Sequence, residues 1–252
     1  ELAQAFLIGS WNENKDADKR AISLFVKKDY SAWISKMREI IQLPNSPLQL
    51  KNGIWFIKDR LQLFHQVKNM IFDEDLEALK SMAAVVLKEK DPQFELESDQ
   101  RYAAQIYGKV TEHSSNIRAG IVEGVAIIGS HAEEITYCSK YKPENTIYSL
   151  LDDVFKDADW QIWAGMNQQL PLLFEASPKK MFENMEKSAK LFSDDDKEGN
   201  EYTDMFGDRM YQSMAETMVS SGQGLGIAQM LYESMARNSG ISTSTETTTK
   251  TE

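Results

Sequence analysis

The feature that most constrains the fold of this chain is a ladder of apolar side chains near the C-terminus, spaced four residues apart. It consists of Tyr202, Phe206, Met210, Met214 and Met218. Residues four apart face the same way on an α-helix, so this spacing predicts one apolar helix side. Gly222, Gly224 and Gly226 follow, and such glycines end one helix and allow a tight entry into the next. Two short amphipathic helices are therefore predicted over 201–235.

Two interpretations of this ladder are open. A helical stripe of methionine and aromatic side chains most often packs into the core of its own domain. A module of about 50 residues buries little apolar surface by itself, however, and flexible thioether side chains suit adaptable protein-binding grooves. The ladder is therefore expected either to pack on the preceding helices or to be covered by a protein partner.

Helical periodicity also dominates the first part of the chain. Apolar residues recur at helical spacing over 30–41 and 76–86, and Pro44 ends the first of these helices. Further helices are predicted over 101–113, 116–128, 145–155 and 159–174. Pro171 should kink or end the last of them. Antiparallel helices of this length are compatible with a helical-repeat solenoid.

One β-hairpin is predicted within this helical pattern. Two short β-like runs, 48–51 and 54–57, are joined by Asn52 and Gly53, which tolerate the positive φ angles of a type I′ turn. Two helical signals precede the hairpin, so 16–60 is a possible winged helix. This stretch is locally basic, which fits DNA binding through its second helix. Its basic residues alternate with acidic ones, however, which favours a winged helix that only packs inside a larger protein.

Composition excludes several classes of function. No apolar run reaches the roughly 18 residues that span a bilayer, and no cleavable secretory signal is seen at the N-terminus. The net charge of -11 argues against nucleic acid as the main partner. Cys138 is the single cysteine, so neither an intrachain disulfide nor a cysteine-based metal site is expected.

Residue usage changes near position 180 and suggests two modules. The five Trp residues lie before this position, whereas most of the Met residues lie after it. The prediction is an all-α protein: an antiparallel helical array over 1–178 with one small β-hairpin, and a short C-terminal helical module over 179–238. The Ser/Thr-rich end, 239–252, is predicted to be a disordered tail because it cannot repay the entropy of ordering.

The search for catalytic chemistry gives no positive signal. Motifs for a nucleophile elbow or a phosphate-binding loop are missing, and Cys138 is expected to be a buried or half-buried structural cysteine. His131 and Glu134 lie three apart and could form part of a carboxylate metal site with Glu123. Because no second helix repeats the motif, the favoured interpretation is an exposed helix start with Ser130 near the N-cap. No catalytic residue, metal or cofactor is therefore predicted.

The C-terminal stretch resembles the rod-binding domain of flagellar rod-assembly proteins. The resemblance rests on the helix over 181–190, the acidic linker, the Met-Phe start after Tyr202 and the Gly-Leu-Gly-Ile-Ala-x-Met-Leu run from Gly224. Gly207-Asp208-Arg209 stands where the family usually has a glutamine-rich patch. The resemblance implies protein contact with rod subunits during assembly of the periplasmic shaft. No muramidase domain follows Met235, so cell-wall cleavage is not implied.

The first 190 residues resemble the winged-helix and helical-repeat part of large bacterial STAND NTPases. The segments that carry this resemblance are GSWNENKDADK, the helix over 30–42 with 48–60, DPQFELESDQRYAAQIYGKV and LPLLFEASP. The resemblance implies a scaffold or sensor of an antiviral defence protein, without the nucleotide-binding domain and without activity of its own. The two resemblances do not normally occur in one protein, which suggests a mosaic joined near Pro178.

The leading hypothesis is a non-enzymatic protein that binds flagellar rod components, located at the periplasmic rod. The predicted partner-binding residues are Tyr202, Met205, Phe206, Met210, Met214, Met218, Gly224, Leu225, Gly226 and Met230. The alternatives are a cytoplasmic STAND-type scaffold or sensor and a winged-helix DNA-binding protein. Neither membrane insertion nor a small-molecule ligand is expected.

Overall fold

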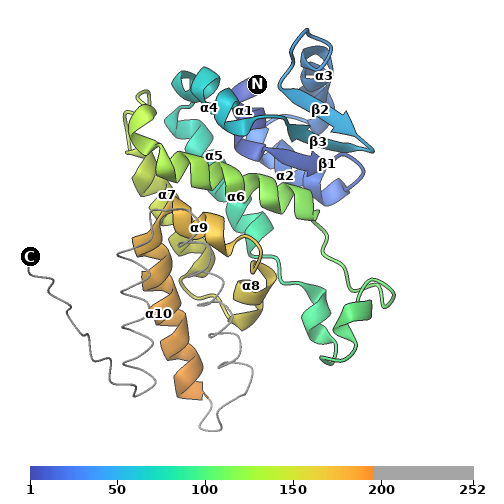
Figure 1. The fold of residues 1–252 in the computed structure, drawn as a ribbon, viewed down its shortest axis with the longest axis vertical. Helices are drawn as coiled ribbons and strands as arrows, with labels where there is room; N and C mark the ends of the chain where they lie inside the picture. Colours follow the sequence, from blue (N-terminus) through green and yellow to red (C-terminus); the bar gives the residue numbers. More distant parts are fainter. Residues whose placement is uncertain (196–252) are drawn as a thin grey trace, which may run out of the picture. The chain divides into compact units, whose positions relative to one another are not determined.

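The computed structural model describes residues 1–195, which are mostly α-helical, as predicted (Figure 1). The ten α-helices of this range are α1 (Leu2–Ile8), α2 (Asp16–Val26), α3 (Tyr30–Ile40), α4 (Arg60–Val67), α5 (Asp73–Leu87), α6 (Ser115–Ser130), α7 (Pro143–Phe155), α8 (Trp160–Gly165), α9 (Leu170–Ala176) and α10 (Pro178–Asp195). The strands are β1 (Ser10–Asn12), β2 (Leu48–Lys51) and β3 (Ile54–Ile57), and four short 3-10 turns are η1 (Lys68–Met70), η2 (Pro92–Glu95), η3 (Arg101–Ala103) and η4 (Ala132–Glu134). No helix within 1–195 is both long enough and apolar enough to cross a bilayer.

The predicted hairpin is confirmed, and it belongs to a larger sheet. Asn52 and Gly53 adopt positive φ angles of 54° and 78° between β2 and β3. A third strand, β1, pairs antiparallel with β3, so the strand order is β1-β3-β2. This strand lies outside the expected stretch 16–60, because its three residues are too few to give a periodic signal.

Three tryptophans form the core beneath this sheet. The rings of Trp11 and Trp55 stack with centroids 5.5 Å apart, and Trp33 lies 5.2 Å from Trp11. Each buried indole needs a hydrogen-bond acceptor for its N–H. Trp11 donates to the hydroxyl of Tyr30, Trp33 to the side chain of Gln4 and Trp55 to the carboxylate of Glu13. The tryptophans therefore fix α3 and the sheet against each other.

Helix α6 is the centre of the described fold. It packs against α1, α5, α7, α9 and β1 (Figure 1). Gly120 and Gly124 permit this approach: a Cβ at Gly124 would lie 2.9 Å from the carbonyl oxygen of Leu7, and one at Gly120 would lie 3.0 Å from the carbonyl oxygen of Ser10. Because α6 contacts elements far away in the sequence, the helices do not form a solenoid, in which each repeat contacts only its neighbours.

The side chain of Arg60 joins α1, α4 and α6. It is buried, and its guanidinium donates to the carbonyl oxygens of Phe6 at 2.6 Å, Leu7 at 3.2 Å and Gly120 at 2.5 Å. The last carbonyls of a helix have no partner within the helix, so Arg60 caps the C-terminus of α1. A bond of 2.9 Å to Glu123 balances its charge.

Two predicted helices differ from the structure. The stretch 101–113 contains only the turn η3 and loops, with Gly108 at a φ of 68°. The stretch 159–174 is divided into α8 and α9 by a turn at 166–169. Pro171 occupies the first turn of α9, where its missing N–H costs nothing. Proline therefore begins a new helix here and does not kink a continuous one.

Candidate functional site

The ten predicted partner-binding residues, from Tyr202 to Met230, lie outside the described residues, as does the expected tail over 239–252. The predicted module over 179–238 is represented in the structure by residues 179–195, which belong to α10. This helix is part of the compact unit Glu1–Asp195. Its contacts therefore show how the C-terminal stretch is attached to the rest of the chain.

One face of α10 is buried against the preceding helices. The helix packs on α7 and α9 (Figure 1). Met181 and Met185 are buried, and the ring of Phe182 lies 5.1 Å from that of Phe174 in an edge-to-face arrangement. The first two methionines of the C-terminal stretch therefore pack into the core of the body.

A charged residue lies in the same interface. Lys180 is 5% exposed, and its ammonium forms an ion pair with Asp152 of α7 and lies 3.9 Å from the carboxylate of Glu183. It also lies 4.6 Å from the centre of the Tyr148 ring, as in a cation–π interaction. The hydroxyl of Tyr148 donates to Glu183, which raises the pKa of the tyrosine. The buried cation thus has its charge balanced by two carboxylates.

Two further polar side chains of α10 are buried. The side-chain amide of Asn184 donates to the carbonyl oxygen of Leu151 at 3.1 Å. The hydroxyl of Ser188 accepts a hydrogen bond of 3.1 Å from the indole N–H of Trp163. Together with Lys180 these residues recur every four positions, which aligns them along one side of the helix. We call Lys180, Asn184 and Ser188 the polar stripe.

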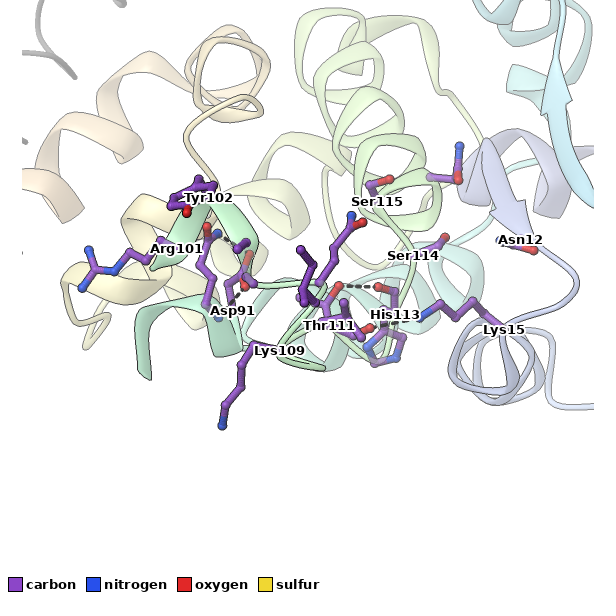
Figure 2. A pocket seen from close by; sticks show the side chains of 17 residues that line it. Asn12, Lys15, Asp91, Arg101, Tyr102, Lys109, Thr111, His113, Ser114 and Ser115 are labelled. Atoms are coloured by element: carbon purple, nitrogen blue, oxygen red, sulfur yellow. Dashed lines mark hydrogen bonds between the residues drawn. The ribbon is translucent and has the colours of Figure 1, made fainter. Parts of the chain in front are cut away.

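A second candidate region is the arm, residues 88–114, which connects α5 to α6 and extends to one side of the body (Figure 1). An open cleft of about 790 Å³ lies between the arm, β1 and the start of α6 (Figure 2). The lining is mixed: Lys15, Arg101 and Lys109 contribute positive charge and Asp91 contributes negative charge. The ammonium of Lys15 donates to the carbonyl oxygen of Thr111, and that of Lys109 pairs with Glu95.

The two ends of the arm are joined by Glu89. Its carboxylate accepts hydrogen bonds from the backbone N–H groups of Glu112 and His113, and lies 2.6 Å from Nδ1 of His113. Burial raises the pKa of Glu89, but the hydrogen bonds from the His113 ring and from both amides outweigh it and lower the pKa overall. Arg118 of α6 donates to the carbonyl oxygen of Glu89. This network closes the base of the arm and aligns it with α6.

A buried carboxylate fixes the start of α6 beside this base. Asp18 accepts hydrogen bonds from the backbone N–H and the hydroxyl of Ser114, and from the backbone N–H of Asn12. The hydroxyl of Ser114 in turn caps α6 by accepting from the N–H of Ile117. Because each of these polar atoms is used structurally, Ser114 is not poised as a nucleophile despite its nearby carboxylate.

The outer end of the arm exposes apolar side chains. Tyr102 is 92% exposed and Ile106 is 86% exposed, and Tyr107 and Val110 are also exposed. The side chains of Tyr102 and Ile106 therefore have no surface within the described residues to pack on. Most helical stability in proteins comes from such packing, which explains why the predicted helix over 101–113 is absent.

The residues weighed as a metal site serve separate contacts. Glu123 pairs with Arg60, and Glu134 pairs with Lys68 and lies 3.6 Å from His65. His131 follows Ser130 at the C-terminal end of α6, so the expected helix start with Ser130 at the N-cap is wrong. Within 1–195 no group of three or more His, Cys, Asp or Glu side chains is arranged to hold a metal ion.

Cys138 is half-buried, as predicted. Its sulfur lies 3.8 Å from the carbonyl oxygen of Ile71. Burial, assisted by the nearby carboxylates of Asp73 and Asp75, raises the pKa of the thiol to about 11. At neutral pH the side chain is therefore a protonated thiol, which is a poor nucleophile.

The described residues thus define a mostly-α body whose last helix begins the predicted interaction module. Residues 179–233 match the family model described as "Rod binding protein". This is about a fifth of the chain, and it supports the resemblance of the C-terminal stretch to a non-catalytic, flagellar rod-related protein-interaction domain. No curated protein and no solved structure matches the chain. The resemblance of the first 190 residues to STAND NTPases is not shown by these comparisons and stays a prediction.

Proposed function

We propose that this chain is a non-enzymatic interaction protein that binds components of the bacterial flagellar rod during rod assembly. The observation that carries this proposal is the position of the family match, which covers 179–233 and so includes the whole methionine ladder. Because the rod is assembled in the periplasm, the proposed function implies that the protein would act there.

The binding surface would be the apolar side of the ladder and the glycine turn that follows it. Met205, Met210, Met214, Met218 and Met230 supply flexible apolar contacts. The turn at Gly224-Leu225-Gly226 would place the second helix beside the first, and Tyr202 and Phe206 would act as aromatic anchors. Met181 and Met185 are buried against the body. This supports two separate roles: these two methionines attach the module to the body, and those from Met205 onward bind the partner.

A pull-down with purified rod proteins tests this function. In the variant Met210→Glu/Met214→Glu two carboxylates would have to be buried in an apolar interface, which is strongly unfavourable. We expect this variant to lose binding. The matched control is Gln212→Glu/Ala215→Glu, which adds the same charge to the opposite side of the predicted helix and should still bind. Equal capture of both variants would refute the proposed surface, and no capture of the unmodified chain would refute the function.

A second candidate function rests on the small sheet. The order α1-β1-α2-α3-β2-β3, with strands arranged β1-β3-β2, supports a winged helix that starts earlier than the expected 16–60. The charges on α3 do not favour DNA. Lys36 pairs with Glu39 at 2.9 Å and Arg38 pairs with Glu13 at 3.1 Å, which reduces the positive charge available to phosphates.

We therefore favour packing within a larger protein as the role of this winged helix, in keeping with a scaffold or sensor of the STAND type. In that case the chain would act in the cytoplasm. A mobility-shift assay at low salt separates the two possibilities. DNA binding that weakens steeply with added salt would support a DNA-binding winged helix, and the absence of any shift would dismiss it.

A further inference from the structure

We propose that the polar stripe consists of positioning residues, which hold α10 in a single register on the body and so fix where the rod-binding stretch begins. This inference rests on the proposed function for its biological meaning, but its structural part stands on contacts within 1–195. Helix α10 belongs both to the compact unit Glu1–Asp195 and to the family match over 179–233. It is therefore the physical connection between the body and the interaction module.

The stripe makes three specific contacts at successive turns of α10. Lys180 pairs with Asp152, Asn184 donates to the carbonyl oxygen of Leu151, and Ser188 accepts from the indole of Trp163. All three stripe residues are at most 5% exposed. Each contact therefore takes place away from water, where a polar group without its partner is costly.

Apolar contacts alone would not define this register. Methionine side chains are flexible and adapt to irregular surfaces, so Met181 and Met185 would still find apolar partners if α10 moved along α7. A shift of one helical turn, about 5.4 Å, would instead bring Lys180 to the contact of Asn184 and Asn184 to the contact of Ser188. A buried ammonium would then lose its carboxylate. Single buried polar residues fix helix register in coiled coils in the same way.

The arrangement also restricts how a partner can use α10. The inner face of the helix is covered by the body, and Lys187 lies at its edge, 4.0 Å from Asp152, whereas Lys179 is exposed. A protein bound to 179–233 would therefore contact α10 from its outer side and leave the stripe docked. If the partner binds the docked helix more tightly than the undocked one, docking and partner binding favour each other, and by linkage a variant that weakens docking also weakens binding.

Amide hydrogen exchange in the full chain tests the docking of α10. The neighbouring residues Lys179 and Lys180 allow a variant and its matched control to be compared. Lys180→Met removes the buried charge, whereas Lys179→Met makes the same change at an exposed position one residue earlier. We expect exchange over 178–188 to accelerate at least tenfold in Lys180→Met and less than twofold in Lys179→Met. Equal exchange in the two variants would overturn the proposal. Ser188→Ala is a milder variant that removes one hydrogen bond and should accelerate exchange by about fivefold.

A further variant separates a role in register from a role in stability alone. In Asp152→Leu/Lys180→Met the ion pair is replaced by apolar side chains, which often preserves or raises stability. The indole N–H resonance of Trp163, assigned by its response to Ser188→Ala, then reports the position of α10. We expect this resonance to shift or split although the melting temperature is retained. A single unshifted resonance would mean that the stripe only stabilises the fold, and would overturn the proposal.

Titration with purified rod proteins completes the test. If the unmodified chain does not bind them, the proposed function fails, and the exchange and resonance measurements still decide whether the stripe positions α10. If the unmodified chain binds and Lys180→Met binds at least fivefold more weakly than Lys179→Met, the linkage is supported. Equal binding by the two variants would refute the claim that docking assists the partner.

Discussion

Replacing Arg60 by methionine should be the most damaging single change in the centre of the body. Methionine fills a similar volume but cannot donate to the carbonyl oxygens of Phe6 and Leu7, which Arg60 bonds at 2.6 and 3.2 Å at the end of α1. Leaving a buried carbonyl without a donor lowers the free energy of unfolding by about 1–3 kcal/mol. Loss of the donors to the Phe6 and Leu7 carbonyls should therefore lower it by about 4 kcal/mol in total. Glu123 is half-exposed and regains water, so its lost partner adds little.

The measurement is urea unfolding followed by tryptophan fluorescence, supported by thermal melting. For a domain of this size each kcal/mol lowers the melting temperature by about 2–4 °C, which gives a decrease of about 8–16 °C for Arg60→Met. The matched control is Arg20→Met, which removes an exposed pair with Glu112 and should cost less than about 1 kcal/mol. If Arg60→Met lost no more stability than this control, the guanidinium would not be the cap of α1 that we describe.

Three further predictions concern single sites. Cys138 should react with a disulfide reagent at pH 8 about tenfold more slowly than in the urea-unfolded chain, because a thiol pKa of about 11 leaves little thiolate; equal rates would contradict its burial. Since the pKa of Glu89 is lowered in the folded state, its contribution to stability is present above the unfolded pKa and is lost as the pH falls through the folded value. As the pH is lowered, the free energy of unfolding should therefore fall more steeply for the unmodified chain than for Glu89→Gln. If the two proteins lost stability in parallel as the pH fell, the Glu89 carboxylate would not stabilise the fold in this way. Gly120→Ala should lose about 2 kcal/mol in urea unfolding because its Cβ would press on the backbone of β1, whereas Gly165→Ala, whose Cβ has no neighbour closer than 3.9 Å, should be nearly neutral.

Local signals in the sequence predicted much of the fold. The Asn52-Gly53 turn identified the hairpin, and apolar periodicity located α3, α5, α6 and α7, because both features depend on residues close together in the chain. The three-residue strand β1 was missed because it is too short for a pattern. Its formation depends on pairing with β3, more than 40 residues away, which periodicity does not reveal.

The contacts that organise the candidate sites were harder to foresee. Arg60 bonds residues 54 and 60 positions away, and Glu89 closes the arm onto His113; neither pairing has a local signature. The polar stripe did have one, since Lys180, Asn184 and Ser188 recur every four residues directly before or after apolar positions. Polar residues at helical spacing usually mark a solvated face, however, and burial decides the question only in the folded chain.

Calorimetric titration of purified rod proteins into the full chain tests the central claim, that the methionine ladder is the surface that binds the rod. We expect saturable binding by the unmodified chain and by Gln212→Glu/Ala215→Glu, and a loss of at least a hundredfold in affinity for Met210→Glu/Met214→Glu, about 2.7 kcal/mol. Unchanged affinity in the ladder variant, with its helical circular dichroism preserved, would contradict the account.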